Sequence, residues 1–266
     1  MDFRHRFILL IAIYTPSVLI AQVLNVEREA NTDSIQKQWD IVSGITFSAD
    51  RQKKNIVDLN SNFELVRNLK NSYSILGLAR NDAVISGNDI LQNEGMMHLR
   101  YQDLNKRKLS IETYAQYQWN GAWGMEYRYL GGLNLRLKWI NNDKINFYSG
   151  FGVFHEWEKW NWSGVAEDLV PLNAALQFRS LNRLNNYSKF SAKLSSLIDF
   201  TLINYLQFPI NKNLINPRWF VEMNTYFIAN KHLNFVLRWD HIFDKNTLVP
   251  IDNFYYGYST GIQYKF

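Results

Sequence analysis

The chain has 266 residues, of which 47% are hydrophobic and 20% are charged, so its composition is not that of a disordered protein. It contains no cysteine, which excludes disulfides, thiolate metal sites and cysteine nucleophiles. The formal net charge of +5 is spread along the chain with no run of five like charges, so it does not indicate a nucleic-acid partner.

The first residues have the parts of a secretory signal peptide. Arg4 and Arg6 form a basic start, an apolar run follows over residues 7–14, and Ala21 offers a small side chain for cleavage. The sequence therefore predicts a signal peptide over residues 1–21. We interpret residues 22–37 as an N-terminal periplasmic arm, an extended first strand or a partial plug.

Apolar and polar residues then alternate with a period of two over long stretches, which is typical of strands with two different faces. Within residues 108–120, for example, Leu109, Ile111 and Tyr117 share one face and Glu112 lies on the other. The alternating segments run for about 10–16 residues, whereas strands of soluble proteins average about 5–6. A tilted strand needs about 9–11 residues to cross a bilayer, so the pattern favours a transmembrane β-barrel.

Twelve such strands are predicted, and their connections fall into two classes. An even number of strands places both chain ends on the periplasmic side of an outer-membrane barrel. The connections on that side are then all short, and the long ones lie on the other side, at 83–93, 161–184, 209–216 and 245–252. The predicted fold class is all-β, a single antiparallel barrel over residues 38–266. Its strands are expected at 38–49, 55–69, 71–82, 94–104, 108–120, 125–140, 144–160, 185–195, 198–208, 217–228, 232–244 and 253–266.

Aromatic residues gather near the predicted strand ends, as at Trp119, Trp157 and Tyr256. Outer-membrane barrels carry aromatic girdles at these levels. The last strand closes with Tyr264 and Phe266. Such an ending resembles the signal that the barrel assembly machinery reads, so we expect that machinery as a partner during biogenesis.

The face opposite the apolar one carries charged residues, which are predicted to line the barrel interior. If the periplasmic turns centre on Lys106, Asn142 and Asn230, the residues that oppose each other across each turn can be matched. We therefore expect a charged, cross-bridged interior. The matching places Arg100 opposite Glu112, Arg128 opposite Glu156, Glu126 opposite Glu158, and Arg238 opposite Glu222.

Two interpretations of this interior stay open. Paired charges can fill a narrow barrel and fix its register, because a lone charge away from water is costly. The same charges can instead form the wall of a polar channel. The strand number does not decide between them, since twelve strands make a barrel wider than those that side chains fill and narrower than open porins.

Two histidines, His155 and His241, share the parity of the lipid-facing residues and lie near the outer strand ends. They invite comparison with outer-membrane phospholipases, which use serine, histidine and a polar partner on the outside of a barrel. The alternative is an amphipathic side chain at the headgroup level. No lipid-facing serine lies clearly opposite His241, and no histidine pair has metal-binding spacing. We therefore expect no enzyme, and no catalytic, cofactor or metal site.

Several short segments occur in a characteristic order. They are Asn25-Val26-Glu27-Arg28, His98-Leu99-Arg100-Tyr101, the run 112–118, the run 128–132 with Arg136, and Gly150-Phe151-Gly152 followed by Glu156 and Glu158. Together with the final strand they resemble the YdiY-like salt-induced outer membrane proteins, a domain-of-unknown-function family. The resemblance spans roughly residues 25–266 and rests on the order and spacing of these segments. It implies an outer-membrane β-barrel without established activity or substrate, and the family name hints at an osmotic or salt response.

The expected protein is an integral barrel in the outer membrane of a Gram-negative-type bacterium, surrounded by outer-membrane lipids. A narrow porin-like channel and a structural envelope protein are the two leading interpretations, and the sequence does not identify a solute or ion. The alternatives are an outer-membrane lipid hydrolase and a secreted adhesive β domain.

Overall fold

The computed structural model describes residues 39–51, 55–69, 73–86, 89–103, 108–210 and 216–265. The predicted signal peptide, the segment 22–37 and Phe266 lie outside these residues. Within the described part of the chain, no helix is long and apolar enough to cross a membrane.

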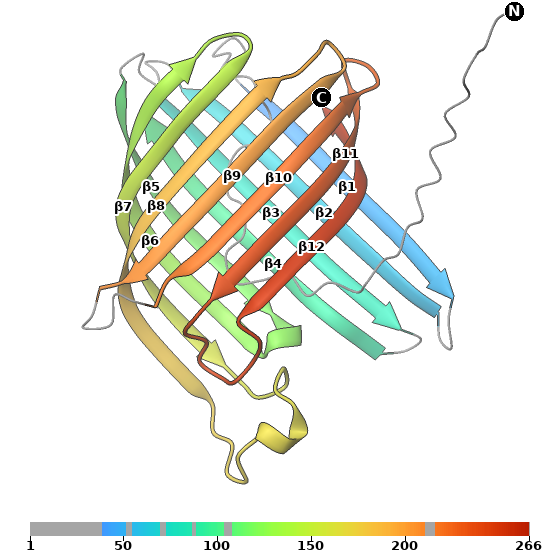
Figure 1. The fold of residues 1–266 in the computed structure, drawn as a ribbon, viewed down its shortest axis with the longest axis vertical. Coiled ribbons are helices and arrows are strands. Elements are labelled where there is room, and N and C mark those ends of the chain that lie inside the picture. The colour runs from blue at the N-terminus through green and yellow to red at the C-terminus, as the bar shows by residue number, and fades with distance from the viewer. Residues whose placement is uncertain are drawn as a thin grey trace, which may run out of the picture.

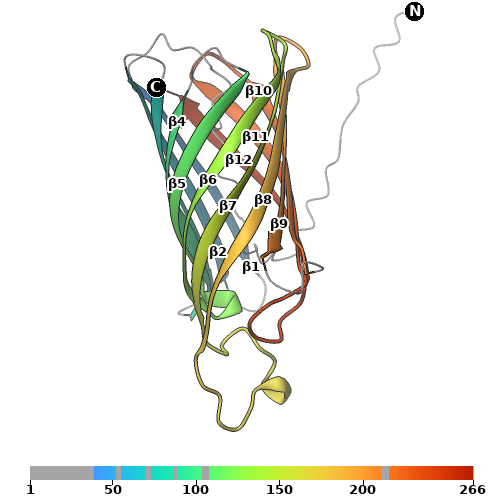
Figure 2. The same ribbon diagram turned by 90° about the vertical axis from the view of Figure 1, so that its left-hand side faces the viewer.

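Twelve strands close into one antiparallel barrel, in which each strand pairs with its neighbours in chain order and β12 pairs with β1 (Figures 1 and 2). The predicted all-β, twelve-stranded fold is confirmed. The strands are β1 (Trp39–Arg51), β2 (Asn55–Leu69), β3 (Tyr73–Ser86), β4 (Asp89–Asp103), β5 (Leu109–Asn120), β6 (Met125–Asn141), β7 (Ile145–Trp160), β8 (Gln177–Lys193), β9 (Ile198–Pro209), β10 (Arg218–Ile228), β11 (Leu233–Asp244) and β12 (Phe254–Lys265).

The two ends of the barrel differ. The start of β1 and the end of β12 share one end, where every connection between strands is short; this end, here termed the turn end, is uppermost in Figure 1. The opposite, loop end carries the longer connections 161–176, 210–217 and 245–253. It also carries the short helices η1 (Gly121–Trp123) and η2 (Glu167–Leu169).

Two predicted connections are longer than the real ones. The loop predicted at 83–93 is wrong, because β3 and β4 stay paired beyond a register shift at Val84 and Ile85 and reach Ser86 and Asp89. The loop predicted at 161–184 is also too long, because β8 begins at Gln177.

Alternation along each strand separates two surfaces. On β6 and β7, Leu133, Leu135 and Phe151 are exposed on the outside, whereas Asn134 and Arg136 are buried inside. Apolar side chains outside and polar side chains inside are the arrangement of a membrane-spanning barrel.

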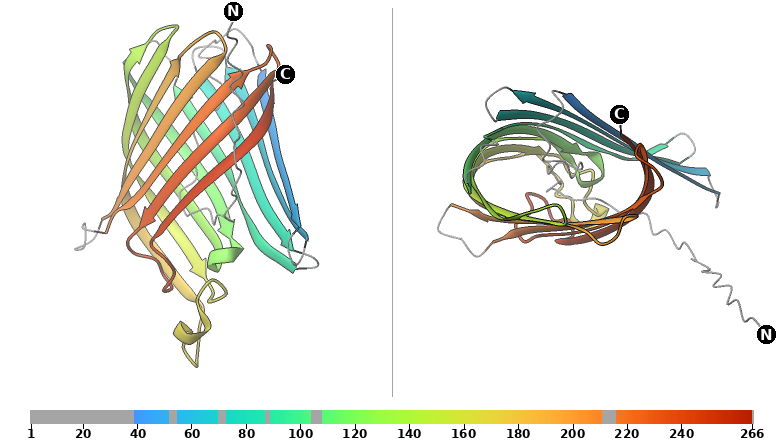
Figure 3. Two further views of the ribbon diagram at one scale, coloured as in Figure 1. Left: turned by 45° about the vertical axis from the view of Figure 1, so that its right-hand side comes forward. Right: turned by 90° about the horizontal axis from the view of Figure 1, so that it is seen from above.

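The seam between β1 and β12 is the weakest part of the wall. Its register covers only Val42–Ile45 against Ile262–Lys265, whereas each other neighbouring pair of strands matches at nine or more positions. In Figure 3 the two strands meet near the turn end and diverge toward the loop end.

An apolar cluster lies at the loop end. Trp123 of η1, Trp160 at the end of β7, and Val165 and Val249 from two loops are all buried in one core. The Trp123 ring lies 4.7 Å from that of Tyr255, centre to centre. Val165 and Val249 therefore pack at the mouth of the barrel, whereas η2 and residues 171–176 are exposed and project beyond it (Figures 1 and 2).

Candidate functional site

A network of ion pairs lies inside the barrel, directly beneath this apolar cluster. The Glu156 carboxylate receives Arg128 Nε at 2.8 Å, Arg183 Nε at 2.5 Å and Arg218 Nη1 at 3.2 Å. The side chains of Glu156, Arg183 and Arg218 are all completely buried. One carboxylate thus joins arginines from β6, β8 and β10.

A second carboxylate extends the network. Glu158 Oε1 lies 3.2 Å from Arg218 Nη2 and 3.3 Å from Arg128 Nε, and Glu158 Oε2 accepts a hydrogen bond of 2.8 Å from Arg179 Nε. Arg218 Nε also donates to Asp244 Oδ2 at 2.8 Å. Four arginines meet three carboxylates here, which leaves one positive charge in excess. We term these seven residues the interior cluster: Arg128, Glu156, Glu158, Arg179, Arg183, Arg218 and Asp244.

Several interior contacts join strands that are not neighbours in the wall. Arg218 of β10 reaches the glutamates of β7, and the Tyr187 hydroxyl of β8 donates to Glu112 of β5. Arg80 of β3 lies 3.7 Å from Glu222 of β10, on a strand far around the barrel. Side chains therefore bridge the lumen in more than one direction.

The predicted interior residues other than Glu126 lie inside the barrel, but the predicted register is displaced. Arg128 is opposite Glu158, Arg100 is opposite Tyr114, and Arg238 is opposite Asn224. Each match is two residues from the predicted one. A displacement of two keeps every side chain on its face, so Arg128 still contacts Glu156 and Arg238 Nε lies 3.8 Å from Glu222 Oε1.

The displacement has a local cause at two turns. Asn142 Oδ1 accepts from the backbone N–H groups of Lys144 and Ile145, and Asn230 Oδ1 accepts from those of His232 and Leu233. Each asparagine therefore begins its turn instead of occupying the centre, as asparagine commonly does.

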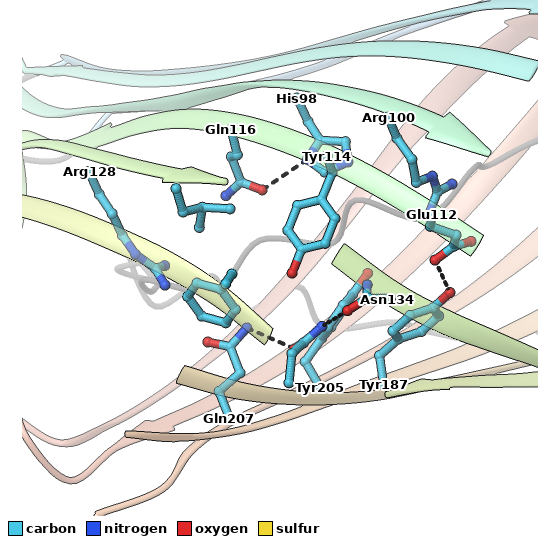
Figure 4. A pocket seen from close by; sticks show the side chains of 13 residues that line it. His98, Arg100, Glu112, Tyr114, Gln116, Arg128, Asn134, Tyr187, Tyr205 and Gln207 are labelled. Carbon is cyan, nitrogen blue, oxygen red and sulfur yellow. Dashed lines mark hydrogen bonds between the residues drawn. The ribbon is translucent and has the colours of Figure 1, made fainter. Parts of the chain in front are cut away.

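One predicted partner is wrong, and another residue has a partner that was not predicted. Glu126 does not face Glu158, because a register irregularity between Met125 and Tyr127 places it beside Lys159, with 2.6 Å between Glu126 Oε2 and Lys159 Nζ. Glu112, which lies beside Arg100 in Figure 4, also accepts a hydrogen bond of 2.9 Å from Arg136 Nη1.

A small cavity lies inside the barrel between β4 and β9 (Figure 4). Its volume is about 30 Å³, which is room for about two water molecules. Its walls include Arg100, Glu112, Tyr187 and Gln207, and His98 Nδ1 lies 3.1 Å from Gln116 Oε1 beside it. The cavity therefore has room for water.

A second polar cluster lies on the outer surface, on the other face of the same β7–β8 hairpin. His155 Nδ1 lies 2.8 Å from Asn182 Oδ1, and His155 Nε2 lies 2.9 Å from Ser180 Oγ. Ser180 and Asn182 are exposed, and His155 is partly exposed. We term these three residues the exterior cluster.

Sequence reasoning missed the exterior cluster because it placed the start of β8 too late. Ser180 and Asn182 occupy outward positions of Gln177–Lys193, where an alternating pattern calls for apolar residues. Arg179 and Arg183 of the interior cluster were missed for the same reason. The length of β7 could have shown the error, because a strand of sixteen residues needs a neighbouring strand of similar length.

Two further sequence features, a Gly-x-Ser-x-Gly sequence and His241, do not form candidate sites in the structure. A Gly-x-Ser-x-Gly sequence at 257–261 was also missed, but it lies inside β12, and Ser259 faces the interior near Arg238. The ring contacts of His241 among the described residues are with Trp219, Trp239 and Phe254. Among the described residues, no group of three or more His, Cys, Asp or Glu side chains could hold a metal ion.

The predicted assembly signal is described only in part. Tyr264 points outward, is 43% exposed and stacks on the His232 ring at the turn end. Phe266 lies outside the described residues.

Comparison with known proteins identifies the fold class. No protein-family model and no curated protein matches the chain. The translocator domain of the autotransporter NalP from Neisseria meningitidis matches with a TM-score of 0.50 and 7% identity, over 88% of this chain and 90% of that one. The chain is a β-barrel of the outer-membrane type.

Two porins also match. The NanC porin gives a TM-score of 0.48 at 12% identity, over 85% of this chain and 100% of that one. The KdgM porin gives 0.41 at 9% identity, over 86% and 99%. Since identities this low carry only the fold, the resemblance to the YdiY-like family stays a prediction.

Proposed function

We propose that this chain is an integral barrel of the Gram-negative outer membrane whose lumen is filled, so that it acts as a membrane-embedded scaffold and not as an open channel. The turn end faces the periplasm and the loop end faces outward, as the short and long connections of such barrels do. Outer-membrane lipids contact the exposed apolar residues of the strands.

The observation that carries this proposal is the burial of the interior cluster. In a water-filled lumen, arginine and glutamate side chains would remain exposed, whereas Glu156, Arg183 and Arg218 are completely buried. Removing charges from water is costly unless they are paired, and these charges pair with one another across the lumen. The apolar cluster around Trp123 and Trp160 then covers them from the outer side.

Solute uptake into liposomes tests the proposal. Proteoliposomes in an isotonic solution of arabinose or glycine should swell no faster than protein-free liposomes. Heat-modifiable migration on a cold detergent gel must first show that the barrel is closed and inserted. Swelling of verified proteoliposomes above the protein-free control would contradict a filled lumen.

We also propose that Tyr264 and Phe266 act as the signal for the barrel assembly machinery. Deleting Phe266 should reduce the amount of inserted barrel in the outer membrane and leave degradation products in the periplasm. Replacing Phe254, at the far end of the same strand, with Ala is the matched control. Equal insertion of the deletion variant and the wild type would remove the proposal.

A further inference from the structure

We propose that Ser180, His155 and Asn182 form a serine-esterase site on the lipid-facing surface of the barrel, with the carboxylic ester of a membrane phospholipid as the substrate. The three side chains have the hydrogen-bond order of a nucleophile, a general base and a residue that orients the base. The proposed site lies on the outer surface, so it does not depend on whether the lumen of the barrel is filled.

The hydrogen-bond chemistry fixes the role of each ring nitrogen. Asn182 Oδ1 can only accept, so His155 Nδ1 must carry the ring proton that bridges their 2.8 Å separation. His155 Nε2 then has a free lone pair and accepts from the Ser180 hydroxyl at 2.9 Å. This is the tautomer in which histidine can take a proton from serine.

The surroundings place the cluster at the level of a lipid ester. Toward the turn end, Val153 and Leu184 present exposed apolar side chains, as the hydrocarbon region requires. Toward the loop end, Glu126 and Lys159 form an ion pair that suits the headgroup region. Trp157 lies between these levels with its ring 4.2 Å from that of His155. Tryptophan favours the interface, where the ester groups of phospholipids lie.

The structure also leaves space beside the cluster. On β6 and β5, the outward positions in line with His155 are Gly131 and Ala115, which offer no bulk to a lipid chain.

The reaction balances with water as the only co-reactant. Ser180 Oγ bonds to the ester carbonyl carbon as its proton passes to His155 Nε2. The bond from that carbon to the alcohol oxygen then breaks, and His155 protonates the departing lysophospholipid. Water attacks the acyl-serine with its proton taken by His155, and the fatty acid leaves as that proton returns to Ser180 Oγ.

Fatty-acid release tests the site directly. The probe is palmitoyl-oleoyl phosphatidylethanolamine in dodecyl-maltoside mixed micelles with the full-length, folded barrel. We expect release by the wild type and by Ser188→Ala, which changes another outward residue of β8, and at least about a thousand-fold less by Ser180→Ala. A fluorophosphonate, which loses fluoride to an activated serine, should label Ser180 in the wild type.

Asn182 is a positioning residue, so its test needs a readout beyond the rate. Asn182→Ala should release fatty acid at least tenfold more slowly, whereas Asn182→Asp should retain release with the acid limb of its pH profile moved to higher pH, because a carboxylate stabilises imidazolium. If the Ser180→Ala variant still releases fatty acid as the wild type does, the proposal is wrong. So does a wild type that shows neither release nor labelling, with or without calcium.

Discussion

The β7–β8 hairpin carries two polar clusters back to back, and they differ in every physical respect. On the inner face, Glu156 and Glu158 are buried and each contacts several arginines. On the outer face, His155 and Ser180 are partly or fully exposed and form a neutral chain of hydrogen bonds. Successive residues of a strand point to opposite faces, so the sequence can place two unrelated chemistries one residue apart.

The comparison shows what each cluster can do. A buried charge network has no access to a solute and strongly couples the strands that supply it, so it affects stability. An exposed hydrogen-bonded chain contributes little to stability but meets the surrounding lipid, so it can affect chemistry. Stability and activity should therefore respond to different faces of the same hairpin.

The largest expected effect on stability follows from Arg218→Ala. Arg218 contacts Glu156, Glu158 and Asp244, and its removal leaves three buried carboxylates short of a partner. Loss of one member of a buried network costs about 3–5 kcal/mol, and we expect the upper part of that range. The urea unfolding midpoint in detergent measures it. An unchanged midpoint would mean that water reaches these groups.

Arg128→Ala should have the second largest effect on stability. We expect it to lower the free energy of unfolding by an amount in the lower part of the range of about 3–5 kcal/mol, because Arg128 contacts two carboxylates instead of three. A double-mutant cycle with Glu156→Gln isolates the direct interaction. Zero coupling between the two positions would show that they do not meet in the folded barrel.

Glu126→Gln should have a much smaller effect. The ion pair between Glu126 and Lys159 lies on the outside with both side chains partly exposed, where solvent and salt screen it. The unfolding midpoint should stay close to that of the wild type and should not depend on salt concentration more than the wild type does. A midpoint loss as large as that of Arg128→Ala would contradict the division between the two faces.

Ser180→Ala should have the smallest effect on stability, although it should abolish esterase activity. The substitution removes one exposed hydroxyl and its hydrogen bond to His155. Thermal unfolding monitored by circular dichroism should give the same midpoint as the wild type. If activity and stability fall together, the exterior cluster is a structural contact and not a catalytic one.

Sequence patterns predicted the wall of the barrel well. The bounds of β2, Asn55–Leu69, match the predicted strand, although Val66 is buried inside and Arg67 is exposed outside, so the alternation is not perfect. The inward face of Arg128, Glu156 and Glu158 was also predictable, because a period of two fixes the face even when the register is displaced.

The remaining features depend on information that alternation does not contain. The register required the knowledge that Asn142 and Asn230 begin their turns. The contacts of Arg218 with β7 depend on how closely distant strands approach across the lumen. Ser180 and Asn182 break the pattern that finds strands, as functional residues commonly do.

The filled lumen is tested most directly by single-channel current across a planar bilayer that contains the refolded wild-type barrel. We predict no stepwise conductance of porin size at any applied potential, because the interior cluster and the apolar cluster at the loop end occupy the path. Regular open-channel steps with a reversal potential that favours anions, as the single excess positive charge of the interior cluster would produce, would contradict it.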